Sequence, residues 1–201
     1  MLFYERSGLY MLFVSTELEA VNTLLAAVGD SPVNTLDDHM SIDVYNAQRM
    51  LEAMSRMVQS RGWQFNTATE TELIPDAVSK RIRYNPTWIV LTDASDGKTY
   101  VKRGDYLYNL SDKTYVFDSP LTMTVIEAVD FEDLPQCFKV YITAKAAIKF
   151  QSRYLGDDSV SQMLIAESNE AYSDIVQYSI DTGVNGLQIA GIAELLSRSD
   201  N

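Results

Sequence analysis

The chain has few of the side chains with which small enzymes and metal proteins build their sites. Its 201 residues include one cysteine, Cys137, and one histidine, His39. A single cysteine excludes a disulfide within the chain, and Cys137 is most simply a small buried hydrophobic residue. A histidine without a second histidine or cysteine does not make a zinc site, so His39 is expected to be a solvated loop residue. We therefore expect no metal ion and no cofactor.

Long hydrophobic runs and a surplus of positive charge are also missing. No segment approaches the roughly 20 apolar residues of a membrane-spanning helix. The net charge of −12 argues against non-specific binding of nucleic acid by the outer surface. Acidic residues are concentrated at the two ends: six acids and one base in residues 1–40, and eight acids and one base in residues 157–201.

Known catalytic motifs are missing as well. The sequence contains no glycine-rich phosphate loop, no serine in a nucleophile elbow and no paired histidines. Carboxylates are abundant, but no spacing distinguishes two of them as a general acid and a general base. The residues by themselves indicate no chemistry.

Helical periodicity is present before residue 63. Thr16 and Glu19 form a capping box at the start of a first helix, which Gly29 ends. A second helix is expected from about Ser41 to Arg61, with an apolar seam at alternating spacings of three and four. The positions of that seam are Val44, Ala47, Leu51, Met54 and Val58.

The best-marked element is a helix expected between Asp133 and Gly156. Asp133 suits the N-cap, Pro135 the first turn, and Gly156 the left-handed position after the last turn. Its apolar face repeats every four residues, at Phe138, Ile142, Ala146, Phe150 and Tyr154. Beside that face runs a cationic line formed by Lys145, Lys149 and Arg153.

A fourth helix is expected from Asp157 or Asp158 to about Asp181. It contains no lysine or arginine. Charges of one sign on a helix repel one another, which is easier to explain if a basic partner lies opposite. Its expected buried positions are Val160, Met163, Leu164, Ala171, Ile175 and Tyr178.

Between residues 63 and 132 the hydrophobic period becomes that of β-strands. The expected strands are Trp88–Thr92, Lys98–Arg103, Tyr106–Leu110, Tyr115–Phe117 and Leu121–Ile126. Asp96 and Gly97 suit a tight hairpin turn between the first two strands. The tyrosines of this region are expected to pack across strands, with a carbohydrate-binding platform as the less favoured alternative.

Together these elements predict an α+β fold, a mainly α-helical bundle of four long helices with a small antiparallel β-sheet domain inserted between helices 2 and 3. The expected parts are an N-terminal extension (1–15), the bundle (16–62 and 133–182), the inserted β domain (63–132) and a C-terminal docking tail (183–201). The apolar residues of the tail are Leu187, Ile189, Ile192, Leu195 and Leu196. A tail this short cannot bury its own apolar side chains, and it is therefore expected to dock on its own subunit or on a partner.

Six segments occur in an order typical of one known family. They are AVNTLLAAVGDSPVNTL (20–36), QSRGWQFN (59–66), LIPD (73–76), RGDYLYN (103–109), FDS (117–119) and LPQCFKVYITAKAAIKFQSRYLG (134–156). QSRGWQFN followed by LIPD, and the later LPxCF helix start, are specific in combination. The chain thus resembles tail tubular protein A, the adaptor or gatekeeper ring protein of short-tailed podovirus-type bacteriophages, over roughly residues 16–181.

The resemblance implies a structural protein of the virion tail, without catalytic activity, that is assembled in the host cytoplasm. It implies a homododecameric ring between the portal protein and the tail nozzle protein, tail tubular protein B. Double-stranded genomic DNA would pass through the ring, and the tail fibre protein would attach around it. Two alternatives stay open: a tail-associated polysaccharide or peptidoglycan hydrolase using a carboxylate pair, and a cytoplasmic regulatory or scaffold protein.

The ring interpretation gives two hypotheses about sites. The cationic line is expected to face acidic residues of the fourth helix in its own or the next subunit, where charge complementarity would fix orientation. Those subunit-interface acids are Glu167, Glu170 and Asp174. The apolar tail is expected to dock on the portal, with packing inside the ring as the alternative.

Overall fold

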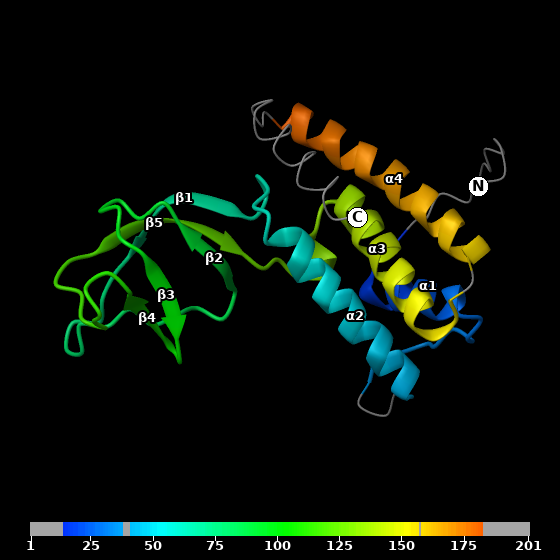
Figure 1. Ribbon diagram of the computed structural model, residues 1–201, viewed down its shortest axis with the longest axis horizontal. Helices are drawn as coiled ribbons and strands as arrows, with labels where there is room; N and C mark the ends of the chain where they lie inside the picture. The colour runs from blue at the N-terminus through cyan, green and yellow to red at the C-terminus, as the bar shows by residue number, and fades with distance from the viewer. Residues whose placement is uncertain (1–13, 38–40, 157, 183–201) are drawn as a thin grey trace. The chain divides into compact units, whose positions relative to one another are not determined.

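The computed structural model describes residues 14–37, 41–156 and 158–182, which fold as four α-helices and five β-strands (Figure 1). The helices are α1 (Glu17–Ala27), α2 (Ile42–Gln59), α3 (Gln136–Tyr154) and α4 (Asp158–Asp181). All five strands lie between α2 and α3 in the chain, so the predicted α+β class with a β insertion is confirmed. Within the described ranges the chain forms two compact units, a helical unit (14–55 and 130–182) and a β unit (56–129).

In the helical unit, α3 is the central element and packs against both α1 and α4. Most of its circumference is buried, including the predicted face at Phe138, Ile142, Ala146 and Phe150. Tyr154 at the end of that face is 46% exposed. The capping box of α1 is present as predicted, with the Thr16 side chain accepting a hydrogen bond from the Glu19 N–H. On α4, Leu164, Ala171 and Ile175 are buried, but Met163 is 56% exposed, so its predicted burial is wrong.

The start of α3 differs from the prediction. The helix begins at Gln136, and Asp133 ends a short 3-10 helix, Phe131–Asp133, so Asp133 is not the N-cap. Leu134 has φ −67° and ψ 145°, an extended conformation. The ring of Pro135 disfavours helical geometry at the preceding residue, which explains why α3 cannot start earlier. The predicted end is confirmed, because Gly156 has φ +68°.

The β unit contains two antiparallel sheets instead of one. The first has the order β1-β5-β2, built from β1 (Thr67–Leu73), β5 (Leu121–Glu127) and β2 (Trp88–Thr92). The second is a hairpin of β3 (Tyr100–Arg103) and β4 (Tyr106–Asn109).

Two predictions about these strands are wrong. The expected β2–β3 hairpin does not form, since β2 pairs with β5 and β3 pairs with β4. Tyr115–Phe117 is not a strand, although the neighbouring Thr114 forms an isolated bridge with Asn109. Strand β1 was not predicted, because its residues TATETEL show no apolar alternation.

The two sheets share one hydrophobic core. It contains residues from four strands together with two from the loops: Leu73, Ile82, Tyr100, Leu107, Phe117, Leu121, Met123 and Val125. The Tyr100 and Phe117 rings lie 5.8 Å apart between centroids. The β3–β4 hairpin is therefore held in place by packing as well as by its own hydrogen bonds.

The QSRGWQFN segment joins the end of α2 to the β unit through buried amides. Gln59 donates to the Val129 carbonyl at 3.0 Å and accepts from the Val129 N–H at 2.7 Å. Asn66 donates to the carbonyls of Gln59 and Glu127, and the Trp63 indole donates to Val58. This segment thus connects the start of the β unit to its end at residues 127–129. The motif therefore has a structural role.

Candidate assembly surface

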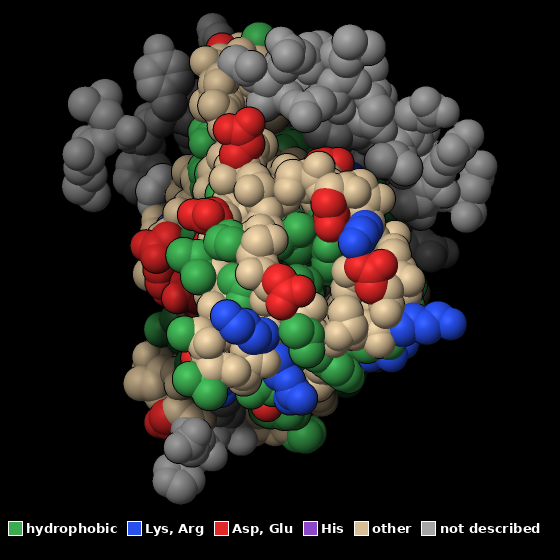
Figure 2. Space-filling model, turned by 90° about the vertical axis from the view of Figure 1, so that its left-hand side faces the viewer, with side chains coloured by type: hydrophobic (Ala, Val, Ile, Leu, Met, Phe, Trp, Pro, Cys, Tyr) green, Lys and Arg blue, Asp and Glu red, His purple; other side chains and the backbone are tan. Residues whose placement is uncertain are grey.

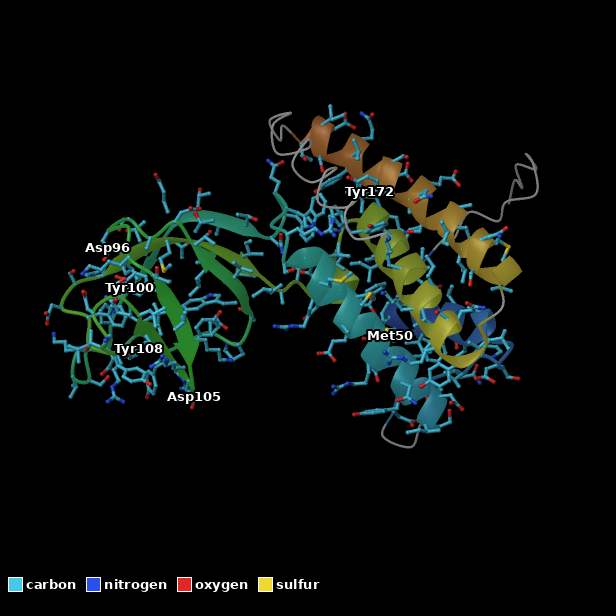
Figure 3. The ribbon with its side chains drawn as sticks, in the orientation of Figure 1. Met50, Asp96, Tyr100, Asp105, Tyr108 and Tyr172 are labelled. Atoms are coloured by element: carbon cyan, nitrogen blue, oxygen red, sulfur yellow. The ribbon has the colours of Figure 1, made fainter. Side chains whose placement is uncertain are left out.

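The paired helices α3 and α4 carry both sets of residues expected at a subunit interface. They run antiparallel, with ring contacts between Phe138 and Tyr178 (centroids 5.7 Å apart) and between Tyr141 and Tyr172 (5.8 Å). Figure 3 shows Tyr172 where the two helices face each other. In the same contact between the two helices, Gln151 of α3 is fully buried and accepts a hydrogen bond from the Ser161 hydroxyl of α4 at 2.8 Å. The helix pair is thus a fixed platform for the charges on its surface.

The cationic line lies along the accessible side of α3. Lys145 is half-buried, with its Nζ 5.7 Å from the centroid of the Tyr141 ring, whereas Lys149 and Arg153 are exposed. Next to Arg153, the large apolar side chains of Tyr154 and Leu155 are 46% and 56% exposed. An exposed apolar patch beside exposed cations is typical of an interaction surface.

The acids of α4 do not neutralise this line within the part of the subunit that the structure describes. Glu170 and Asp174 are exposed and Glu167 is half-buried. Burial, and then the charge of Glu170, raise the pKa of Glu167 above its usual value. Over the described ranges, none of these acids forms an ion pair with the three cations. Pairing between neighbouring subunits stays a prediction.

A fourth cation of α3, which the sequence analysis did not single out, has a structural role. Lys139 is 8% exposed, and its Nζ donates to the backbone carbonyls of Glu132 (2.6 Å) and Ser15 (3.1 Å). It therefore joins the start of α3 to the segment before α1. Its helical position does not distinguish it from the solvated lysines, so the sequence offered no signal for it.

The predicted docking site of the apolar tail, with Leu187, Ile189, Ile192, Leu195 and Leu196, lies outside the described residues. His39, expected to be a solvated loop residue, also lies outside them. Cys137 is half-buried, and burial raises the pKa of its thiol, which favours the unreactive protonated form.

The described residues contain no cluster of three metal-ligating side chains, and no described helix is long and apolar enough to cross a membrane.

The carboxylates near the tyrosines of the β unit do not form a hydrolase-type pair. The Tyr100 hydroxyl donates to Asp96 at 2.6 Å, which lowers the pKa of Asp96, while burial raises the pKa of Tyr100 (Figure 3). Asp112 forms an ion pair with Lys98. A glycosidase needs one carboxyl that stays protonated at neutral pH beside one that is ionised. Asp96 and Asp112 instead fix the turns next to β3 and β4.

Comparison with known proteins identifies the family of this chain. Residues 18–184 match the family described as tail tubular protein. The chain is 30% identical over 165 residues to tail tubular protein A of Klebsiella phage KP34, covering 80% of this chain and 84% of that protein. The chain therefore belongs to the tail tubular protein family, as a structural protein of the phage virion tail, and not to an enzyme family.

Proposed function

We propose that this protein forms the adaptor or gatekeeper ring that joins the portal to the tail nozzle and lets the genome pass during ejection. The portal protein, the nozzle protein and the tail fibre protein would be its partners, with twelve copies in the ring as the resemblance implies. Membership of the tail tubular family supports this role.

The observation that carries the proposal is the pair of unneutralised charged surfaces on one helical unit. A closed ring requires head-to-tail contacts, in which each subunit presents two different and complementary surfaces. The cationic line of α3 and the acidic residues Glu170 and Asp174 of α4 meet that requirement, because within the described chain neither set pairs with the other. Complementary charge would set the orientation of neighbouring subunits.

The acidic balance of the protein also suits a DNA channel. A basic channel wall would bind the phosphates of the duplex, because this binding releases counterions from the DNA. DNA that must slide through the channel should not be bound in this way. The net charge of −12 fits a ring through which double-stranded DNA passes without binding.

Docking on the portal is assigned to the C-terminal tail. Truncation after Asp181 removes the apolar residues of that tail and leaves the described helices intact. The truncated protein should keep its circular dichroism spectrum and lose binding to purified portal in size-exclusion chromatography with light scattering. A folded truncated protein that still binds portal would refute the assignment to the tail, whereas a full-length protein that never binds portal would refute the adaptor role itself.

A further inference from the structure

One face of the β unit gathers arginines and tyrosines from three neighbouring segments. Residues 80–84 lie alongside β4, since the Leu107 N–H donates to the Ile82 carbonyl (2.9 Å) and the Tyr84 N–H to the Asp105 carbonyl (2.8 Å). Ile82 and Leu107 are buried in the core. Because successive residues of an extended chain point to opposite sides, the neighbours of these two core residues lie on the other face. That arginine–tyrosine face consists of Arg81, Arg83, Arg103, Tyr106, Tyr108 and Tyr115.

Tyrosine rings hold two of the three guanidinium groups of this face, those of Arg81 and Arg103. The guanidinium carbon of Arg103 is 3.9 Å from the centroid of the Tyr108 ring. That of Arg81 is 5.4 Å from the Tyr106 centroid and 5.6 Å from the Tyr115 centroid. Tyr108 and Tyr115 meet edge to face with centroids 4.8 Å apart. A ring that covers the flat side of a guanidinium restrains it and leaves the N–H groups at its edge free to donate.

The backbone beneath Arg81 is also fixed. The carboxylate of Asp76 accepts hydrogen bonds from the N–H groups of Val78 (3.2 Å) and Ser79 (2.7 Å) and from the Ser79 hydroxyl (2.8 Å). The Asp76 N–H donates to the Arg81 carbonyl at 2.9 Å. The loop that precedes Arg81 is therefore closed on itself, so binding here would cost little ordering of the backbone.

These arginines have no carboxylate partner in the described part of a protein that is otherwise rich in acid. Arg81, Arg83 and Arg103 are all exposed, and none forms an ion pair over the described ranges. Asp105, the acid at the turn between β3 and β4 (Figure 3), forms no ion pair with them either in the part of the chain that the structure describes. Figure 2 shows Lys and Arg side chains lying against hydrophobic ones on one side of the molecule, with Asp and Glu side chains also on that side.

We propose that the arginine–tyrosine face binds a carboxylate-rich segment of another protein. The edges of restrained guanidiniums suit bidentate pairing with carboxylates. Arginine and tyrosine are also enriched at the energetic centres of protein interfaces, where lysine is depleted. DNA is a poorer fit, because the protein carries a net charge of −12 and because the rings are covered by guanidiniums and do not offer open platforms for bases. The proposal concerns the β unit and is independent of ring formation.

The test uses the full chain and a fluorescent oligo-glutamate peptide of about ten residues, shorter than the roughly 20–30 residues that each side of a standard interface contributes. Fluorescence anisotropy at low salt should show binding by the wild type. The double variant Arg81→Gln, Arg103→Gln should bind at least about tenfold more weakly, because the two charge-assisted contacts of the restrained guanidiniums are lost. Arg49→Gln is the matched control, since Arg49 also lies over a tyrosine, Tyr45, at 6.0 Å, but on α2; it should bind as the wild type does.

A second variant keeps the test decisive if the glutamine variant fails to fold. Arg81→Lys with Arg103→Lys preserves the charge but removes the planar donor pair of each guanidinium, so it should weaken peptide binding several-fold. Wild-type affinity in the folded lysine variant would overturn the proposal. So would the absence of peptide binding by the wild type, equal loss in Arg49→Gln, or tighter binding of a duplex DNA of matched charge. A change of oligomeric state in the glutamine variant would identify a second copy of this chain as the occupant and likewise overturn it.

Discussion

At the residue scale, three buried polar side chains of this protein have specific backbone partners. Lys139 donates to two carbonyls, and Gln59 and Asn66 satisfy backbone groups of residues 127–129. Such groups are costly to bury unpaired, so each of these side chains fixes two distant parts of the chain together. Two single-residue features lead to direct predictions.

Gly62 combines a left-handed backbone with a close neighbour. Its φ is +75°, and a Cβ atom would lie 2.8 Å from the Ile126 Cδ1 and 3.2 Å from the Thr67 Oγ1. Gly62→Ala should reduce the free energy of unfolding by roughly 1–3 kcal/mol, from backbone strain and displacement of Ile126. Urea unfolding measures the loss. In the control Gly97→Ala, φ is +69° with nothing within 4 Å, so only the strain remains. A loss no larger than in that control would contradict the packing argument.

Glu19 should make the stability of the helical unit depend on pH. The N–H groups of Ser15 and Thr16 donate to its carboxylate at 2.7 Å and 3.1 Å and hold its pKa below the usual 4.5. A lowered pKa in the folded state means that the ionised form stabilises the fold. This contribution is present above the unfolded value of 4.5 and is lost as the pH falls through the lowered value.

Glu19→Gln should therefore be less stable than the wild type at neutral pH, and the difference should shrink as the pH falls below 4.5. Urea unfolding at a series of pH values, followed by circular dichroism at the helical wavelengths, measures it. A difference between the two proteins that stays constant down to about pH 3 would show that the charge does not matter.

At the element scale, the elements with strong local signals were predictable and those set by tertiary pairing were not. The capping box of α1 and Gly156 at the end of α3 depend on neighbouring residues, and both are confirmed. Of the predicted seam of α2, Val44, Ala47, Leu51 and Val58 are buried and Met54 is half-buried. The start of α3 was misplaced because the local effect of Pro135 on Leu134 overrides the capping preference of Asp133. Strand β1 alternates Thr and Glu, so its pairing with β5 left no hydrophobic signal.

The junction between α2 and the β unit depends on one buried glutamine. Gln59→Leu keeps the size of the side chain but leaves the Val129 N–H and carbonyl unpaired, which should cost about 2–4 kcal/mol. Both tryptophans of the chain, Trp63 and Trp88, belong to the β unit, so their fluorescence during urea unfolding reports on it. Gln64→Leu, at an exposed position of the same loop, is the control. Equal midpoints for the two variants would contradict the role of Gln59.

At the scale of the whole molecule, the family and the charge patterns could be predicted from the sequence, but the arrangement of the charged residues in space could not. The cationic line and the acidic residues of α4 were visible as patterns, and their assignment to an interface between subunits remains a prediction. The arginine–tyrosine face was not visible, because it joins residues 81–83 to residues 103–115 through pairing with β4 and not through proximity in sequence. Lys139 was hidden for a related reason, since its partners belong to two other segments.

Ring formation by charge complementarity is the central claim, and Lys149 tests it most directly because it is an exposed member of the cationic line. Negative-stain electron microscopy and mass photometry should show rings of the wild type. Lys149→Glu should lose them. Adding Arg153→Glu, Glu170→Lys and Asp174→Lys to the same chain should restore them, because the net charge of both surfaces is then reversed. Lys113→Glu, the same charge change in the β unit, should assemble normally. Normal rings from Lys149→Glu at the same protein concentration would contradict the account.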